Sequence, residues 1–124
     1  MPLWNKVLSG AGGGGPVLTF IGSHTRDGAT ADNYTFSAVS IGVAAADRLV
    51  IVSSYSIRNS GNSTTLDEIA IGGVAGTIVA QNGTSDDVQH GIGTRVVTTG
   101  TTADIKITAR CNLYGIGIWT LTGY

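Results

Sequence analysis

The stretch Ala103–Leu121, "ADIKITARCNLYGIGIWTL", decides the fold class of this chain. In its first half, apolar and polar residues alternate, so that Ile105, Ile107 and Ala109 fall on one side. A period of two is the pattern of a β-strand with one face in the core and one face in solvent. The alternation therefore predicts a strand over Ala103–Cys111, with these three residues directed inward.

The second half of the stretch predicts another strand, Leu113–Leu121. Gly115 and Gly117 interrupt its apolar run, and a glycine inside a strand allows another backbone or side chain to approach closely. The single cysteine, Cys111, excludes an intrachain disulfide. It shares the inward parity of Ile105, Ile107 and Ala109, whereas the adjacent Arg110 has the outward parity, so we expect a buried, unreactive thiol.

Working outward, strand-like runs recur about every 10 to 15 residues, a spacing typical of sandwiches and barrels. The further candidates are Val17–Gly22, Asn33–Ile41, Arg48–Arg58, Asp67–Ile71, Gly76–Gln81 and His90–Thr98. Glycines at positions 72–73 predict a hairpin, and the glycine at position 100 predicts a second turn. The segment 24–32, "HTRDGATAD", also has the composition of a turn.

Inward positions follow from the alternation in two of these runs. In Asn33–Ile41 the pattern places Tyr34 and Phe36 in the core, and in Arg48–Arg58 it places Tyr55 and Ile57 inward. The helix signal is weak throughout, since Ala44–Ala46 is too short to propagate a helix.

Together these patterns predict an all-β fold, an antiparallel jelly-roll-like sandwich of about eight strands. The expected domain occupies residues 16–124, and residues 1–15 form a flexible N-terminal arm and linker. A chain of 124 residues is close to the usual size of one domain and can bury a real core.

Composition excludes several classes of function. Charged residues make up 12% of the chain, the net charge is −1, and the lysines and arginines do not cluster, so we expect no nucleic-acid binding. The sequence contains no run of 18 apolar residues, so we expect no membrane span. The start of the chain lacks the apolar core of a secretory signal. Synthesis in a reducing cytoplasm is the expectation.

The sequence also offers no chemistry-bearing constellation. His24 and His90 are too few for a zinc centre, and the pairs Asp67–Glu68 and Asp86–Asp87 resemble solvated turns rather than calcium loops. No serine lies in a G-x-S-x-G motif. We therefore predict no catalytic, cofactor or metal site, and a protein that is not an enzyme.

Aromatic residues leave one binding alternative open, because a set of them could include a platform on which sugars stack. The inward parity expected for two of the tyrosines favours packing for most of this set. Its members are Trp4, Tyr34, Tyr55, Tyr114, Trp119 and Tyr124.

The N-terminal residues are unusual. The octet Met1–Leu8, "MPLWNKVL", is followed by the small residues 10–15, "GAGGGG", which form a flexible linker rather than a phosphate loop, since no GK[ST] and no helix follow. The octet could add an edge strand to its own domain, dock on a neighbouring subunit or partner, or remain a disordered leader. The residues predicted to bind a partner are its apolar side chains, Leu3, Trp4, Val7 and Leu8.

Three segments resemble one family. "AADRLVIVSSYS" (45–56), "IAIGGVAGTIVAQ" (69–81) and "GTTADIKITARCNLYGIGIWTLTGY" (100–124) are similar to small β-sandwich structural proteins of tailed bacteriophages. The resemblance covers roughly residues 44–123. It implies a virion component, such as a capsid decoration protein, a head fibre, or a tail or fibre module, and it carries no catalytic residues.

The expected function is therefore a phage virion structural protein, most simply a capsid decoration (cement) protein. It would bind the major capsid protein or other virion proteins through its β-sandwich and N-terminal arm, form a homo-oligomer, and need no cofactor. The alternative is a tail-fibre or receptor-binding module that recognises host-surface glycans, and a small hydrolase is a third, weaker alternative.

Overall fold

The computed structural model describes residues 15–58, 65–82 and 88–124, which form seven β-strands and no helix. Consequently, no helix among these described residues could cross a membrane. The predicted all-β class is confirmed. The strands are β1 (Val17–Ser40), β2 (Leu49–Ile57), β3 (Glu68–Ile71), β4 (Val74–Ala75), β5 (Thr77–Gln81), β6 (Val88–Val96) and β7 (Thr102–Thr122).

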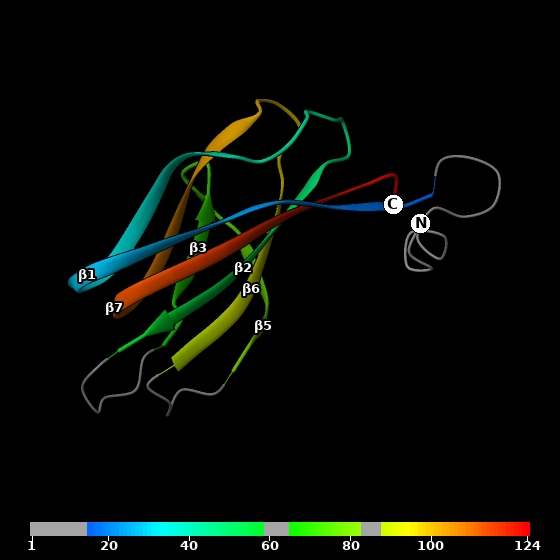
Figure 1. Cartoon of the computed structure of the whole chain (residues 1–124). Coiled ribbons are helices and arrows are strands. Elements are labelled where there is room, and N and C mark those ends of the chain that lie inside the picture. The colour runs from blue at the N-terminus through cyan, green and yellow to red at the C-terminus, as the bar shows by residue number, and fades with distance from the viewer. Residues whose placement is uncertain (1–14, 59–64, 83–87) are drawn as a thin grey trace.

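The first and last strands form one long antiparallel pair. Val17 pairs with Thr122 at one end, and Ser40 pairs with Thr102 at the other. Figure 1 shows the two strands running side by side and turning back at the same place, near the labels β1 and β7. Each strand therefore contributes two arms, one on either side of the bend.

This bend replaces a turn that the sequence predicts. The segment 24–32 lies inside β1, where the pairing with β7 shifts register between Asp27 and Ala31 and again before Asn33. Glycine and aspartate suit bulges as well as turns, and the facing strand supplies partners across the irregularity. The two strands expected over Ala103–Cys111 and Leu113–Leu121 are likewise one continuous strand, β7.

The remaining strands close a ring against the other edge of β7. Its N-terminal arm pairs with β3 and its C-terminal arm with β2, in the order β4-β3-β7-β2-β6-β5. Only Gly76 separates β4, which pairs with β3, from β5, which pairs with β6. The Gly76 N–H donates to the Ile69 carbonyl at 2.8 Å. Seven antiparallel strands thus form a nearly closed barrel.

The sequence predicts a finer arrangement than this, a jelly-roll-like sandwich of about eight strands. The described residues instead form a single seven-stranded sheet that curls on itself. The bends in β1 and β7 each join two segments that the sequence had separated, which lowers the count by two, and the short β4, which was not expected, raises it by one.

Core positions agree with the alternation of β7. Ile105, Ile107 and Ala109 are fully or almost fully buried, as predicted, and so is Phe36. Tyr34 is half-buried and packs against this cluster, with its ring 4.9 Å from that of Phe36. One continuous core lies beneath both arms of β7, since Ile116 and Ile118 belong to it as well.

The predicted hairpin at Gly72–Gly73 and the predicted turn at Gly100 are both present. The second turn joins strands that do not pair, since β2 lies between β6 and β7. Gly72 and Gly73 connect β3 to β4 with φ values of 63° and 76°, a left-handed conformation that glycine adopts without steric cost. Gly100 has a φ of 72° before the start of β7. These turn residues therefore have the role that the sequence suggests.

The predicted facing of β2 is wrong. Val50, Val52, Ser54 and Ser56 are buried, which leaves Tyr55 on the outer side. The strand pairs with β6 and β7 without a bulge, so its apolar first half fixes the inward parity of all that follows. Ile57 shares the outward parity of Tyr55 and is half-buried.

Arg48 is a buried residue that sequence patterns did not single out. Its side chain is fully buried and makes no ion pair with any described carboxylate. Burial lowers the pKa of Arg48 from its usual value. Its guanidinium donates five hydrogen bonds of 2.7 to 3.3 Å, to the backbone carbonyls of Ile41, Gly42, Val97, Thr99 and Gly100. Arg48 therefore ties together the loops at one end of the barrel.

Candidate functional site

The residues predicted to bind a partner, Leu3, Trp4, Val7 and Leu8, lie outside the described residues. Asp86 and Asp87 lie outside them too. The roles suggested for these residues stay predictions.

The other residues considered for chemistry are not brought together. The ring of His24 lies 6.3 Å from Phe36, whereas the ring of His90 lies 6.4 Å from Tyr55 on β2. In the part of the chain that the structure describes, no three His, Cys, Asp or Glu side chains are grouped closely enough to hold a metal ion. Glu68 belongs to a strand and not to a turn, and it forms an ion pair with Lys106.

Cys111 is fully buried, as predicted, beside the bend of β7. Its N–H donates to the Tyr114 hydroxyl oxygen at 3.2 Å, and that oxygen lies 2.6 Å from the Ala31 carbonyl and 2.5 Å from the Ala109 carbonyl. Burial raises the pKa of the Tyr114 phenol. This cluster fixes the bend, and the low reactivity expected of the thiol stays a prediction.

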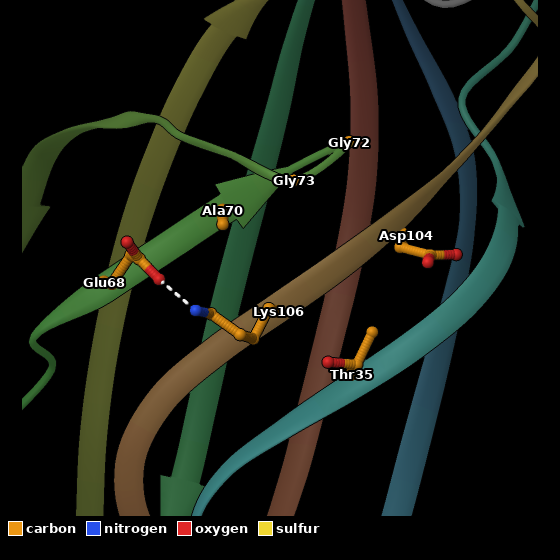
Figure 2. Close-up of a pocket in the computed structure, with 7 residues that line it drawn as sticks. All are labelled: Thr35, Glu68, Ala70, Gly72, Gly73, Asp104 and Lys106. Carbon is orange, nitrogen blue, oxygen red and sulfur yellow. Dashed lines mark ion pairs between the residues drawn. The ribbon is translucent and has the colours of Figure 1, made fainter.

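One outer surface of the barrel is polar and hollowed. It covers β3, the N-terminal arm of β7 and the C-terminal arm of β1, and it contains a hollow of about 500 Å³. Figure 2 shows the hollow with its lining residues, Thr35, Glu68, Ala70, Gly72, Gly73, Asp104 and Lys106. We call this surface the outer polar face.

The charged groups of the outer polar face already have partners within the chain. Lys106 Nζ lies 2.7 Å from Glu68 Oε1, which Figure 2 marks with a dashed line. Asp104 Oδ1 accepts a 2.7 Å hydrogen bond from the N–H of Ala38, whose φ is 50°. The carboxylates are thus engaged in holding strands and a bulge together, and the hollow offers a ligand little free charge.

The surface over the other arms is apolar. Across the sheet, Leu18 of β1, Leu121 of β7, Leu49 of β2 and Val96 of β6 stand in one pairing row. In the next row Phe20, Trp119 and Ile51 stand side by side, and Ile92 follows one row further along β6. We call this surface the outer apolar face, made of Leu18, Phe20, Leu49, Ile51, Ile92, Val96, Trp119 and Leu121.

Several of these side chains are open to solvent. Phe20 is 57% exposed, Val96 51%, Leu18 39% and Ile92 38%. The Phe20 and Trp119 rings are 5.2 Å apart at their centroids and tilted by 54°. A shallow hollow of about 200 Å³ lies here, lined by Leu18, Ile51, Ser53, Ile92 and Trp119.

Two glycines of β7 shape this side of the sheet. A Cβ at Gly117 would lie 2.7 Å from the Trp119 ring, and a Cβ at Gly115 would lie 2.0 Å from the Tyr55 ring. The close approach that the sequence predicts at both glycines is therefore present. The rings lie over the strand because these positions have no side chain.

No charged side chain belongs to the outer apolar face. The arginine nearest in sequence, Arg95, lies between Thr94 and Val96 on β6 and has the opposite parity. Its Nη1 donates to the Ile71 carbonyl, which helps to close the barrel between β6 and β3. The cation is thus used within the fold and does not interrupt the apolar surface.

A second hollow, of about 410 Å³, continues along the same side of the sheet. It is lined by Tyr55, His90, Gln81 and Asn82, together with Ser53, Ser54, Ala80, Gly91 and Ile92. The Asn82 amide is already engaged, since its Nδ2 donates to the Val88 carbonyl and its Oδ1 accepts from the His90 N–H. An aromatic ring and the amide of Gln81 remain as groups that a sugar could contact.

The outer apolar face was missed at the level of sequence. Its members come from four strands, and only the pairing register brings them into rows. The available signal was that Leu18 and Phe20, two residues apart, share a parity, as do Trp119 and Leu121.

Comparisons with known proteins found no matching family model, no matching curated protein and no matching solved structure.

Proposed function

We propose that this chain is a non-enzymatic structural protein of a tailed-phage particle, and specifically a decoration protein on the capsid surface. It would bind the major capsid protein or other virion proteins, act as a homo-oligomer, and reside in the virion after synthesis in the host cytoplasm. The phage assignment derives from the three sequence segments that resemble small virion proteins.

The single observation that carries a binding role is the outer apolar face. Large contiguous apolar patches on the surface of a soluble protein usually mark interaction sites. Here four strands contribute, and Phe20, the most exposed member, has more than half of its surface open. A cement protein needs a surface of this kind because it must remain bound to its neighbours.

The chemistry of the rest of the surface is compatible with this role. The outer polar face uses its carboxylates and its lysine in contacts within the chain. At 12% charged residues, the chain has little capacity for strong electrostatic recognition. Apolar contact is therefore the main source of binding energy that we expect for this protein.

The alternative is a tail-fibre or receptor-binding module that recognises host glycans. The hollow beside Tyr55 and His90 favours it, because sugars stack on aromatic rings and bond to amides such as that of Gln81. The engagement of Asn82 within the chain leaves that hollow with few free amide groups. The decoration protein thus remains the first proposal.

The test is to locate the protein in particles of the phage whose genome carries this sequence. Purified virions are labelled with a gold-conjugated antibody against the chain and imaged by electron microscopy. Label spread over the heads supports a decoration protein. Label at the tail tip, with binding on a glycan array that Tyr55→Ala removes, supports the alternative. Virions that contain none of the protein overturn both proposals.

A further inference from the structure

We propose that the outer apolar face of one copy binds the Met1–Leu8 segment of a second copy of this chain. The inference rests on the proposed function for its biological setting, a shell in which many copies are neighbours. It adds the surface that receives the arm and the residues on each side of the contact.

The first step is that no other part of the described chain covers the face. Leu18, Phe20, Ile92 and Val96 are each between 38% and 57% exposed. Burial of large apolar side chains is favourable, so an apolar occupant would be stabilised on this surface. Nothing in the fold of the described residues requires these outward positions to be apolar, because the core lies on the other side of the sheet.

The second step is the chemistry of the segment. Leu3, Trp4, Val7 and Leu8 stand at positions i, i+1, i+4 and i+5, which fall on one side of a helical turn, while Asn5 and Lys6 fall on the other. Bound in this form, the segment would direct its four apolar side chains to the sheet and its amide and ammonium groups to water. This matches a surface that has no charged residue of its own.

The third step is the size of the surface. Neighbouring strands lie about 4.8 Å apart, so the four strands that carry the face span about 15 Å. An eight-residue segment in helical form is about 12 Å long. The segment can therefore cover the row from Leu18 to Val96, and Trp4 is large enough to contact the hollow between Ile51, Ile92 and Trp119.

The fourth step is where the segment leaves the domain. β1 starts at Val17, one residue before Leu18 and opposite Thr122 at the end of β7. Pro16 fixes its own φ and favours an extended conformation for Gly15, so these two residues would continue β1 outward rather than turn back over the sheet. The eight residues 9–16 reach at most about 28 Å when extended.

This entry direction favours a neighbour over the same copy. To cover its own face, the chain would have to reverse direction within residues 9–16 and return past Leu18. A second copy placed end to end receives the segment without any reversal. Gly10–Gly15 supplies the conformational freedom to cross between two copies.

The test begins with self-association of the purified full chain, measured by sedimentation equilibrium over a range of concentrations. We expect the mass to rise above that of one chain, and Trp4→Ser and Phe20→Ser each to raise the apparent Kd at least tenfold. Val43→Ser is the matched control, because Val43 is 85% exposed and lies outside the face. It should change the Kd by less than twofold.

Mixing separates the two sides of the contact. The Phe20→Ser variant keeps an intact arm, and the Trp4→Ser variant keeps an intact face. A mixture of the two should associate more tightly than either variant alone. The proposal is overturned if the mixture associates no more tightly than the single variants. It is also overturned if the wild-type chain and the Trp4→Ser variant associate equally, because two faces would then meet directly.

Fluorescence distinguishes binding to a neighbour from binding within one copy. The full wild-type chain is used, because its two tryptophans, Trp4 in the segment and Trp119 in the face, would both lie in the contact. The emission of the chain should shift to shorter wavelength as the concentration rises and return on dilution. A blue-shifted emission that is independent of concentration would assign the segment to its own domain and overturn the proposal, as would a chain that stays monomeric with Trp4 exposed. These measurements need no virion, so their failure is distinguishable from a failure of the particle labelling.

Discussion

The two outer faces of this barrel differ in chemistry although the same two strands, β1 and β7, contribute to both. Over one arm of β7, Lys106, Glu68 and Asp104 are joined to each other or to the backbone. Over the other arm, Phe20 and Trp119 lie side by side with no charged residue among their neighbours in the face. One continuous core lies beneath both faces.

This difference separates what folds the protein from what it presents. Both arms of β7 carry buried isoleucines on the inner side, so the inner pattern does not distinguish them. The outer pattern does, because one arm has the polar residues that an exposed sheet usually shows and the other has apolar residues. An apolar outer face over a complete core is therefore better explained by contact with another surface than by the needs of folding.

The largest expected effect tests whether the core is really common to both faces. Ile107 lies beneath the outer polar face and Ile118 beneath the outer apolar face, and both are fully buried. Ile107→Ala and Ile118→Ala should each reduce the free energy of unfolding by about 2–5 kcal/mol, measured by urea denaturation. If one of the two substitutions leaves the free energy of unfolding almost unchanged, the two faces do not share one core.

Next in size is the arginine at the end of the barrel. Arg48→Met removes five hydrogen bonds and leaves backbone carbonyls without partners, so we expect a loss of about 3 kcal/mol in the free energy of unfolding. Arg110→Met is the matched control, because the Arg110 side chain is 61% exposed and its one ion pair among the described residues is with Asp32. Equal effects of the two substitutions would contradict the capping role of Arg48.

A smaller effect should be confined to the apolar side of the sheet. At Gly115 a Cβ would overlap the Tyr55 ring, so Gly115→Ala should cost about 1–3 kcal/mol by displacing that ring. Gly22→Ala, at a β1 glycine with nothing within 4 Å of an added Cβ, should cost far less. The two glycine variants are compared by thermal unfolding. Tyr55→Ala should relieve much of the Gly115→Ala cost in the double variant, and strictly additive costs would show that the ring is not the cause.

The smallest effect should come from the outer polar face. Lys106→Met breaks the ion pair with Glu68. The Lys106 side chain is 42% exposed and the Glu68 side chain 32%, so the free energy of unfolding should change by less than about 1 kcal/mol. The same variant should leave self-association unchanged in sedimentation equilibrium. A clear loss of association would mean that the polar face, and not the apolar one, is the contact surface.

The local pattern of the chain allowed much of the barrel wall to be predicted. The period of two correctly placed Ile105, Ile107 and Ala109 inside, and the glycines correctly marked the turns at 72–73 and 100. Predictions of this kind succeed because alternation and turn chemistry are properties of a few adjacent residues.

The failures have a common cause, which is that they depend on partners distant in sequence. The bend at Asp27–Asn33 looked like a turn because bulges and turns favour the same residues, and only the pairing with β7 distinguishes them. Tyr55 was expected inside because the second half of its run alternates, whereas the parity of β2 is fixed by Val50 and Val52. The face that we propose as a docking surface exists only once four strands are aligned.

The long pairing of β1 with β7 has a consequence for how the chain folds. β7 holds β1 on one edge and β2 and β3 on the other, yet it is the last of the strands to be synthesised. Until it emerges from the ribosome, the earlier strands lack their central partner, and the pairing that follows must close loops between the first and last strands. Such non-local contacts place folding in the millisecond-to-second range typical of all-β domains. During synthesis β1 therefore lacks its pairing strand, and β2 and β3 each have one unpaired edge, until β7 joins them and the barrel forms.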